Sequence, residues 1–283
     1  MLLLTRKVRF SAAHRYYLSD LSEQENRRRF GPCAYPHGHG HDYTAEVTVG
    51  GRIDPANGMV VNISDLKPIL QSEVVAPFDG VYLTAEHPLL GGRIPATEVL
   101  ARIAWDRLAA ALAPLPATLE RVRMAESRRL WADCCRRKTG SDEEPMVTLT
   151  RTYEFAAAHR LHSQQLSDAE NRALFEKCNN PHGHGHNYVL EVTVGGDPDP
   201  RTGLLIDLGL LDEVVHREVV DRYDHRHLNL DIEEFRTLNP TSENLVKVIW
   251  ERLEPALPAG ILRSVTIRET ERNLFTYHGE DPK

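Results

Sequence analysis

An internal duplication constrains this chain more than any other feature of its sequence. Residues 5–51 align without a gap with residues 150–196 at a constant offset of 145, and 27 of the 47 positions are identical. The same offset continues further along the chain, for example from Asp79 to Asp224. A repeat of this length predicts two copies of one domain, because each copy is long enough to form its own core.

The ends of the repeat set the expected domain boundaries. We predict a first domain at residues 1–132, a linker at residues 133–145 and a second domain at residues 146–283. The stretch between the copies is polar and contains glycine and proline, which is typical of a linker. The chain therefore divides into two domains of ordinary size.

The hydrophobic pattern of the second copy indicates an α+β domain. Alternating segments predict four strands, and apolar side chains at helical spacing predict two helices, the second preceded by hydroxyl residues that favour a helix start. The strands are expected at 147–155, 188–194, 264–268 and 274–277, and the helices at 211–220 and 245–253. This order predicts an antiparallel four-stranded sheet with two helices on one face, and the first copy repeats it.

Composition and charge exclude several classes of protein. The net charge of −7 argues against a nucleic-acid-binding surface, which normally needs a basic face. The N-terminus lacks the apolar core of a signal peptide, and no run approaches the length of a membrane span. Four cysteines are too few for a disulfide scaffold. We therefore expect a cytoplasmic, reduced protein that binds neither nucleic acid nor membranes.

The histidines form a repeated cluster. His184 and His186 are two residues apart where a strand begins, so their side chains point to the same face. Together with His159, at the end of the preceding strand, they would give three nitrogen ligands and an open position, which is the arrangement of catalytic zinc. The first copy repeats the set as His14, His39 and His41. The sequence therefore predicts Zn2+ as the cofactor, with one site in each copy.

The histidine cluster has two other interpretations, a solvated loop and a cupin-like metal site. A His-Gly repeat is also compatible with a solvated loop, but two occurrences with the upstream Ala-Ala-His kept both times argue against that. The pair His184 and His186, followed by Glu191, loosely resembles the first metal motif of cupins, which would imply iron or manganese chemistry. Against this, Cys178 stands where that motif has glycine, and amphipathic helices fit a cupin barrel poorly.

Six motifs follow one another through the whole second copy. They are Phe155-x-Ala-Ala-His159, Asn171, Cys178-Asn-Asn-Pro-His-Gly-His-Gly-His-Asn-Tyr188, Tyr223-Asp-His-x-x-Leu-Asn229, Pro240-Thr-Ser-Glu-Asn244 and Arg268-Glu-Thr270. With this set the chain resembles the 6-pyruvoyl-tetrahydropterin synthase family, which also contains the 6-carboxy-tetrahydropterin synthases of queuosine biosynthesis.

The resemblance implies a fold, an assembly and a reaction. The fold is the tunnelling fold (T-fold), in which small sheets join into barrels and active sites form between neighbouring domains. The implied homo-oligomer is a trimer, with a dimer as the other possibility. The implied reaction is that of a carbon–oxygen lyase, which converts 7,8-dihydroneopterin triphosphate to 6-pyruvoyl-tetrahydropterin with loss of triphosphate.

The resemblance also implies roles for individual residues. Zinc held by the triad would chelate the substrate's side-chain hydroxyls and acidify the neighbouring C–H bond. Cys178 would be the base, because a thiolate is stabilised beside a dication. Asp224 and His225 would orient protons for the same step. Glu269 would clamp the pterin ring, and the polar residues Thr241, Ser242 and Glu243 would line the site.

Each assignment has a simpler alternative in the sequence alone. Cys178 is also compatible with a small buried apolar residue. Asp224 and His225 are compatible with a surface pair, and His227 is close enough to be confused with His225. Glu243 is compatible with the acidic residue that is favoured in the first turn of a helix.

The two copies are not equivalent at the predicted site. The first copy keeps its histidines together with Cys33, Asp79, Glu98 and Glu126, but Gly80 stands where the second copy has His225. Glycine cannot transfer protons, so we expect the second copy alone to be catalytically complete. Two alternative functions stay open. One is the 6-carboxy reaction, and the other is a non-catalytic protein that binds zinc and a pterin, which the altered first copy would suit.

Overall fold

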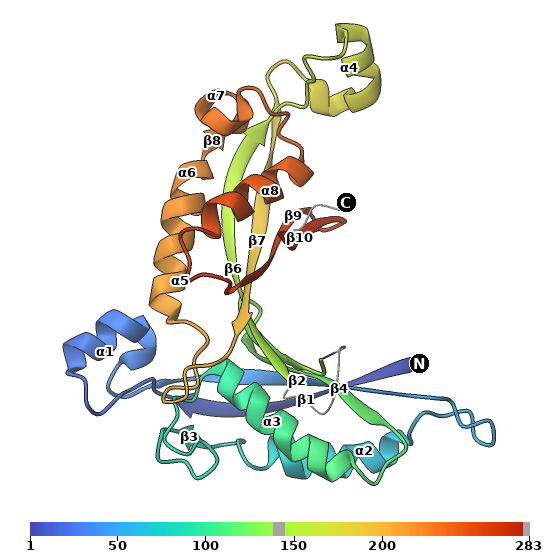
Figure 1. Ribbon diagram of the computed structural model, residues 1–283, viewed down its shortest axis with the longest axis vertical. Helices are drawn as coiled ribbons and strands as arrows, with labels where there is room; N and C mark the ends of the chain where they lie inside the picture. The colour runs from blue at the N-terminus through green and yellow to red at the C-terminus, as the bar shows by residue number, and fades with distance from the viewer. Residues whose placement is uncertain (138–144, 280–283) are drawn as a thin grey trace. The chain divides into compact units, whose positions relative to one another are not determined.

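The computed structural model describes residues 1–137 and 145–279, and the chain separates into two compact units. Unit 1 consists of residues 1–150 together with 195–209, and unit 2 consists of residues 151–194 together with 210–283. Each unit contains both strands and helices (Figure 1). No helix in the described part of the chain is long and apolar enough to cross a bilayer.

Unit 1 is built on two long antiparallel strands. Strand β1 (Leu2–His14) pairs with β2 (His39–Gly51), β2 pairs with β4 (Thr118–Ser127), and β4 pairs with β5 (Leu130–Cys135). The short strand β3 (Tyr82–Leu83) lies parallel to β1 at the other edge. Helix α3 (Thr97–Leu112) packs on β4 and β5. The remaining helices of the first repeat are α1 (Glu23–Phe30), a 3-10 turn (Gly31–Ala34), and α2 (Ile63–Leu70) with a π-helical turn (Gln71–Val75).

The second repeat builds a matching set of strands and, among the described residues, adds two short helices and one 3-10 turn. Strands β6 (Met146–His159) and β7 (His184–Gly196) are neighbours, followed by β9 (Leu262–Thr270) and β10 (Asn273–Tyr277), and β8 (Arg226–His227) lies parallel to β6. Helix α8 (Ser242–Leu253) packs on β9 and β10. The other helices are α4 (Asp168–Phe175), a 3-10 turn (Glu176–Asn179), α5 (Leu208–Val215), a π-helical turn (His216–Val220), α6 (Asp221–Tyr223), α7 (Leu228–Asp231) and a 3-10 turn (Glu233–Phe235).

The core of unit 2 follows from the two-residue period of its strands and the period of about 3.6 residues of its helices. Along β7 every second side chain is buried, including Tyr188, Leu190 and Val192, and α8 packs its apolar stripe on the neighbouring strands β9 and β10. In that stripe Leu245 and Ile249 are fully buried. Burying one such side chain stabilises the fold by about 1.5–3 kcal/mol. The sheet is thereby fixed against one helix layer, and this layer also supports the site.

The α+β architecture and the T-fold are confirmed, and the structure adds elements that were not predicted. The strand that ends at His159 is longer than expected, and α4 was missed. A signal for α4 is present in the sequence, because Ser167 and Glu170 form a reciprocal capping box in the structure.

The end of the first domain predicted at residue 132 lies within strand β5. Strand β5 continues to Cys135, because Asp133 forms a double hydrogen bond with Arg123 on the neighbouring strand. Residues 138–144 of the predicted linker lie outside the described residues. Unit 1 also includes residues 195–209 of the second repeat.

Candidate active site

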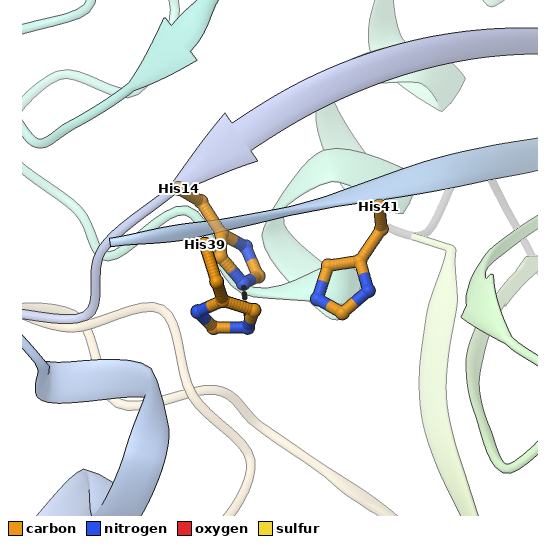
Figure 2. A group of neighbouring side chains, drawn as sticks. All are labelled: His14, His39 and His41. Atoms are coloured by element: carbon orange, nitrogen blue, oxygen red, sulfur yellow. Dashed lines mark hydrogen bonds between the residues drawn. The ribbon is translucent and has the colours of Figure 1, made fainter. Parts of the chain in front are cut away.

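The pairing of β1 with β2 brings the first three histidines together. His14 lies directly opposite His39 in the ladder, and His41 lies two residues further along β2 on the same face. Figure 2 shows the three rings hanging from these two strands on one side. The Nε2 atoms of His14 and His39 are 3.0 Å apart, and the ring centroid of His41 lies 5.0 Å from that of His14.

The second triad has the same construction in unit 2. The Nε2 atom of His159, at the end of β6, lies 3.3 Å from Nε2 of His184, the first residue of β7. The ring centroid of His186 lies 5.3 Å from that of His159. His159 is buried, and its Nδ1 atom is hydrogen-bonded at 2.8 Å to the main-chain carbonyl of Pro240. This hydrogen bond fixes the tautomer and leaves Nε2 directed at the other two rings.

The two triads fit a divalent metal ion. In each triad one nitrogen from every ring lies within 4.8 Å of the others. Burial, followed by the neighbouring imidazoles, lowers the pKa of His184 and that of His159, and it lowers the pKa of His14 to about 3. Nε2 of His186 and Nε2 of His41 are buried and have no hydrogen-bond partner in the described part of the chain. Neutral, unpartnered imidazole nitrogens on one face are the donor set that zinc prefers.

A carboxylate and a hydroxyl lie beside the second triad. Glu269 on β9 has Oε1 3.8 Å from Nε2 of His186 and 3.9 Å from Nε2 of His159. The Ser242 hydroxyl, at the start of α8, donates to the same carboxylate at 2.9 Å. In the first repeat Thr97 and Glu126 form the equivalent hydrogen bond, also at 2.9 Å. Both repeats therefore hold a carboxylate in a fixed orientation next to three histidines.

Cys178 lies near the second triad, on the 3-10 turn after α4. Its main-chain carbonyl accepts a hydrogen bond from Leu161 at 2.9 Å, which ties the turn to the residues after His159. Burial, then Glu269 and then Cys178, raise the pKa of Tyr188, whose ring contacts those of His159 and His186. The thiol is half-buried and unpaired with any other cysteine.

The remaining predicted residues differ in position. The Thr241 side chain caps α8 by accepting from the Asn244 N–H, and Glu243 is exposed in the first turn of the same helix. Asp224 and His225 form a pair, with Oδ2 of Asp224 2.8 Å from Nδ1 of His225. Among the described residues, no hydrogen bond or ion pair joins this pair to the histidines of unit 2. The His225 side chain is 84% exposed.

The backbone at His225 is unusual. Its φ is +57°, in the left-handed region, and the aligned Gly80 has φ +71°. Both residues donate their main-chain N–H to the adjacent strand, His225 to Ala156 and Gly80 to Ser11. A histidine at positive φ is strained by about 1 kcal/mol where glycine is not, and such strain concentrates at functional sites. Both repeats therefore share this turn, but only the second repeat carries an imidazole there.

The first site is covered by a segment of the second repeat that belongs to unit 1. Glu98, the counterpart of Glu243, is buried and accepts a hydrogen bond from the Leu205 N–H at 3.3 Å. Thr202 accepts from the Ile94 N–H at 3.1 Å. Asp207 binds Nε of Arg29 through both carboxylate oxygens at 2.9 Å. These contacts explain why residues 195–209 group with the first repeat, which sequence reasoning missed.

The comparisons with known proteins agree with this geometry. The model of the family described as 6-pyruvoyl tetrahydropterin synthase matches residues 3–137 and, a second time, residues 148–280. The chain belongs to that family. Both matches contain a complete histidine triad, so each repeat is one copy of the family domain.

Individual relatives each correspond to about half of this chain. A putative 6-pyruvoyl tetrahydrobiopterin synthase of Caenorhabditis elegans is 48% identical over 136 residues, which are 48% of this chain and 96% of the relative. The 6-pyruvoyl tetrahydrobiopterin synthase of Drosophila melanogaster is 46% identical over 142 residues, which are 50% and 84%. The solved structure of the C. elegans 6-pyruvoyl tetrahydropterin synthase matches 48% of this chain and 97% of its own, with 47% identity and a TM-score of 0.47.

A more distant relative carries a different name. The 6-carboxy-5,6,7,8-tetrahydropterin synthase of Rickettsia felis is 28% identical over 130 residues, which are 41% of this chain and 86% of the relative. Family membership is therefore shared by proteins with two named products.

The buried Glu98 gives a pH-dependent prediction for the first site. Burial raises the pKa of Glu98 from its usual 4.5 to about 7, so the stability that the neutral carboxyl contributes is fully present below the pKa of the unfolded state and is lost as the pH rises through 7. Glu98→Gln cannot ionise and keeps the acceptor for Leu205. We expect its stability relative to the original protein to grow by on the order of 2 kcal/mol between pH about 5.5 and about 8.5, measured by urea unfolding.

An exposed carboxylate elsewhere supplies the control. Glu213→Gln removes a side chain on α5 that is 72% exposed, and it should show no such growth with pH. A Glu98→Gln difference that stays constant across this pH range would mean that the carboxyl is not held neutral by burial.

Proposed function

We propose that the second repeat is a zinc-dependent carbon–oxygen lyase that converts 7,8-dihydroneopterin triphosphate to 6-pyruvoyl-tetrahydropterin with loss of triphosphate. The observation that carries the proposal is the second triad, with Glu269 and Ser242 held beside it. The names of the more similar relatives favour the 6-pyruvoyl product. None of the described cysteines forms a disulfide bond, which suits a reducing cytoplasm, where we expect this protein to act.

The metal set comes first in this proposal. His159, His184 and His186 would hold the zinc ion in the second repeat, and His14, His39 and His41 would hold one in the first. Bound zinc supplies a Lewis acid that polarises the substrate's side-chain oxygens. Glu269 would accept hydrogen bonds from the pterin ring, since Ser242 already fixes its orientation.

Cys178 is the proposed base. A thiolate accepts protons readily, and the turn that bears Cys178 is fastened next to His159 by the Leu161 hydrogen bond. Removal of the proton from a side-chain carbon, with departure of the triphosphate oxygen from the neighbouring carbon, is the elimination that the family name implies. Asp224 would hold the tautomer of His225, so that Nε2 of His225 is free to move the proton.

Two alternatives follow from particular observations. The likeness to the R. felis relative supports the 6-carboxy reaction, which releases acetaldehyde, so an acetaldehyde assay with the triphosphate substrate distinguishes the products. Gly80 in the first repeat supports a non-catalytic zinc and pterin site there. A protein that binds zinc and pterin in both repeats but never releases triphosphate would favour the second alternative.

The exposed parts of both repeats support a homo-oligomer. The segment 203–207 that covers Glu98 aligns with 58–62, yet Leu204 is 4% exposed and its counterpart Met59 is 42% exposed. Glu243, the counterpart of Glu98, is also exposed, as is His225. We infer that segment 58–62 of one chain covers Glu243 of another, so that the second site is completed by a second copy of the chain.

Cysteine substitution tests the base. Cys178→Ala should lower triphosphate release by at least about a hundredfold, because general-base catalysis contributes that much, while zinc content stays unchanged. The matched variant is Cys33→Ala, which should keep most of the activity. If Cys33→Ala is the inactive variant instead, His225 serves the first triad and the assignment to Cys178 is wrong.

The strained histidine gives a second test. His225→Gly recreates the first-repeat backbone, so relief of strain and the extra freedom of glycine should nearly cancel, and stability should change by less than about 1 kcal/mol. Triphosphate release should nonetheless fall at least about a hundredfold. Full activity in a folded His225→Gly variant would show that the imidazole takes no part.

The proposed assembly is tested by mass in solution. We expect at least two chains per particle, with a trimer as our first expectation and a dimer as the second. Met59→Asp should weaken the particle, because it places a charge in the inferred contact, whereas Leu174→Asp at another exposed apolar position should not. A monomer that retains activity would refute the shared site.

A further inference from the structure

A polar cavity in unit 2 is not used by the proposed mechanism. Its volume is about 220 Å3, and its lining includes Arg160 and His162, which follow His159 in the sequence. Basic and amide side chains dominate its lining, and none of the described residues that line it is acidic. The basic and amide residues are Arg160, His162, Gln164, His227, Asn229, Arg236 and Asn239.

The cations of this cavity are not neutralised by carboxylates. Arg160 donates to the Asn179 carbonyl at 3.3 Å and approaches Nδ1 of His162 at 3.2 Å. No ion pair involves Arg160 or Arg236 among the described residues. The nearby Asp231 is occupied by the main-chain N–H of His227 at 2.8 Å and is not in the lining. The cavity therefore carries a net positive charge with free donors.

His227 also lines this cavity. Its Nδ1 atom is buried and has no hydrogen-bond partner among the described residues. A buried polar atom without a partner is unfavourable unless a ligand or water satisfies it.

The first repeat has lost this chemistry. At the aligned positions Tyr17 replaces His162, Tyr82 replaces His227, Gly91 replaces Arg236, and Ile94 replaces Asn239. The one basic residue that is kept, Arg15, makes two hydrogen bonds to Glu23 at 2.8 and 2.9 Å and stacks on Tyr17. The positive cavity is thus confined to the repeat that also retains His225.

The cavity adjoins the second triad through the chain. His159 donates to the carbonyl of Pro240. Arg160, which follows His159, and Asn239, which precedes Pro240, both line the cavity. The cavity therefore offers cations without carboxylate partners directly after the triad residue His159 in the sequence.

We propose that this cavity binds a polyphosphate anion through Arg160, Arg236 and His227, and that the anion is the triphosphate of the pterin substrate. Guanidinium groups match phosphate oxygens in pairs of hydrogen bonds, and a chain of phosphates can satisfy both arginines at once. The assignment to the substrate rests on the proposed function, whereas binding of a polyphosphate does not.

The test is calorimetric titration of the zinc-loaded protein with inorganic triphosphate. Arg236→Ala should weaken binding by about ten- to a hundredfold, since a hydrogen bond to a charged group contributes about 1.5–3 kcal/mol. Arg172→Ala removes an exposed arginine on α4 and should leave the affinity within about twofold. His227→Tyr installs the residue that the first repeat carries, so it should fold, and it should also weaken binding.

The outcomes separate the two claims. Equal affinity in Arg236→Ala and the original protein, or no binding by either, overturns the polyphosphate cavity. Arginine-dependent binding by a protein without lyase activity supports the cavity and counts against the proposed function. If the protein is active, competitive inhibition by triphosphate with a raised KM in Arg236→Ala supports the substrate as the source, whereas non-competitive inhibition overturns that source in favour of a separate anion.

Discussion

The hydrogen bond from Nδ1 of His159 to the Pro240 carbonyl is the contact on which the second site depends. It joins the end of strand β6 to the residue that precedes the cap of α8, and it directs Nε2 of His159 at His184. Because His159 is buried and burial lowers its pKa, the ring stays neutral and available as a ligand. Ser242, which lies two residues after Pro240, donates to Glu269, and Asn239, which precedes Pro240, lines the polar cavity.

The duplication shows how one backbone can carry two different chemistries. Glycine occupies the left-handed turns of the first repeat at Gly31 and Gly80, and the second repeat places Glu176 and His225 in the same conformation. Both substitutions introduce strain, and they lie close in sequence to Cys178 and Asp224. The first repeat is relaxed at these turns and has its site covered by residues 202–205 of the second. The second repeat holds the strained residues and exposes them.

Much of the fold and of the metal centre could be predicted because the relevant signals are local. The two-residue spacing of His184 and His186 fixes their common face through the pleat of one strand. The hydroxyls before α8 mark its start. The signal for α4 was equally local, in the capping box of Ser167 and Glu170, and was overlooked.

The remaining features depend on long-range packing that no local pattern encodes. The hydrogen bond from Leu205 to Glu98 joins residues 107 positions apart, and no local sequence pattern around either residue predicts it. Asp224 and His225 were predicted from a motif, but no hydrogen bond or ion pair among the described residues joins them to the histidines of unit 2. Arg160 and Arg236 were missed as a pair because they are 76 positions apart and meet only at a cavity.

The most direct test of the central claim is the zinc content of the purified protein, measured by elemental mass spectrometry together with that of His159→Ala. Two triads predict about two zinc ions per chain, falling to about one in the variant, because removal of one of three ligands empties that site. A protein that binds no zinc, or a folded His159→Ala variant that still holds two ions, would contradict the account.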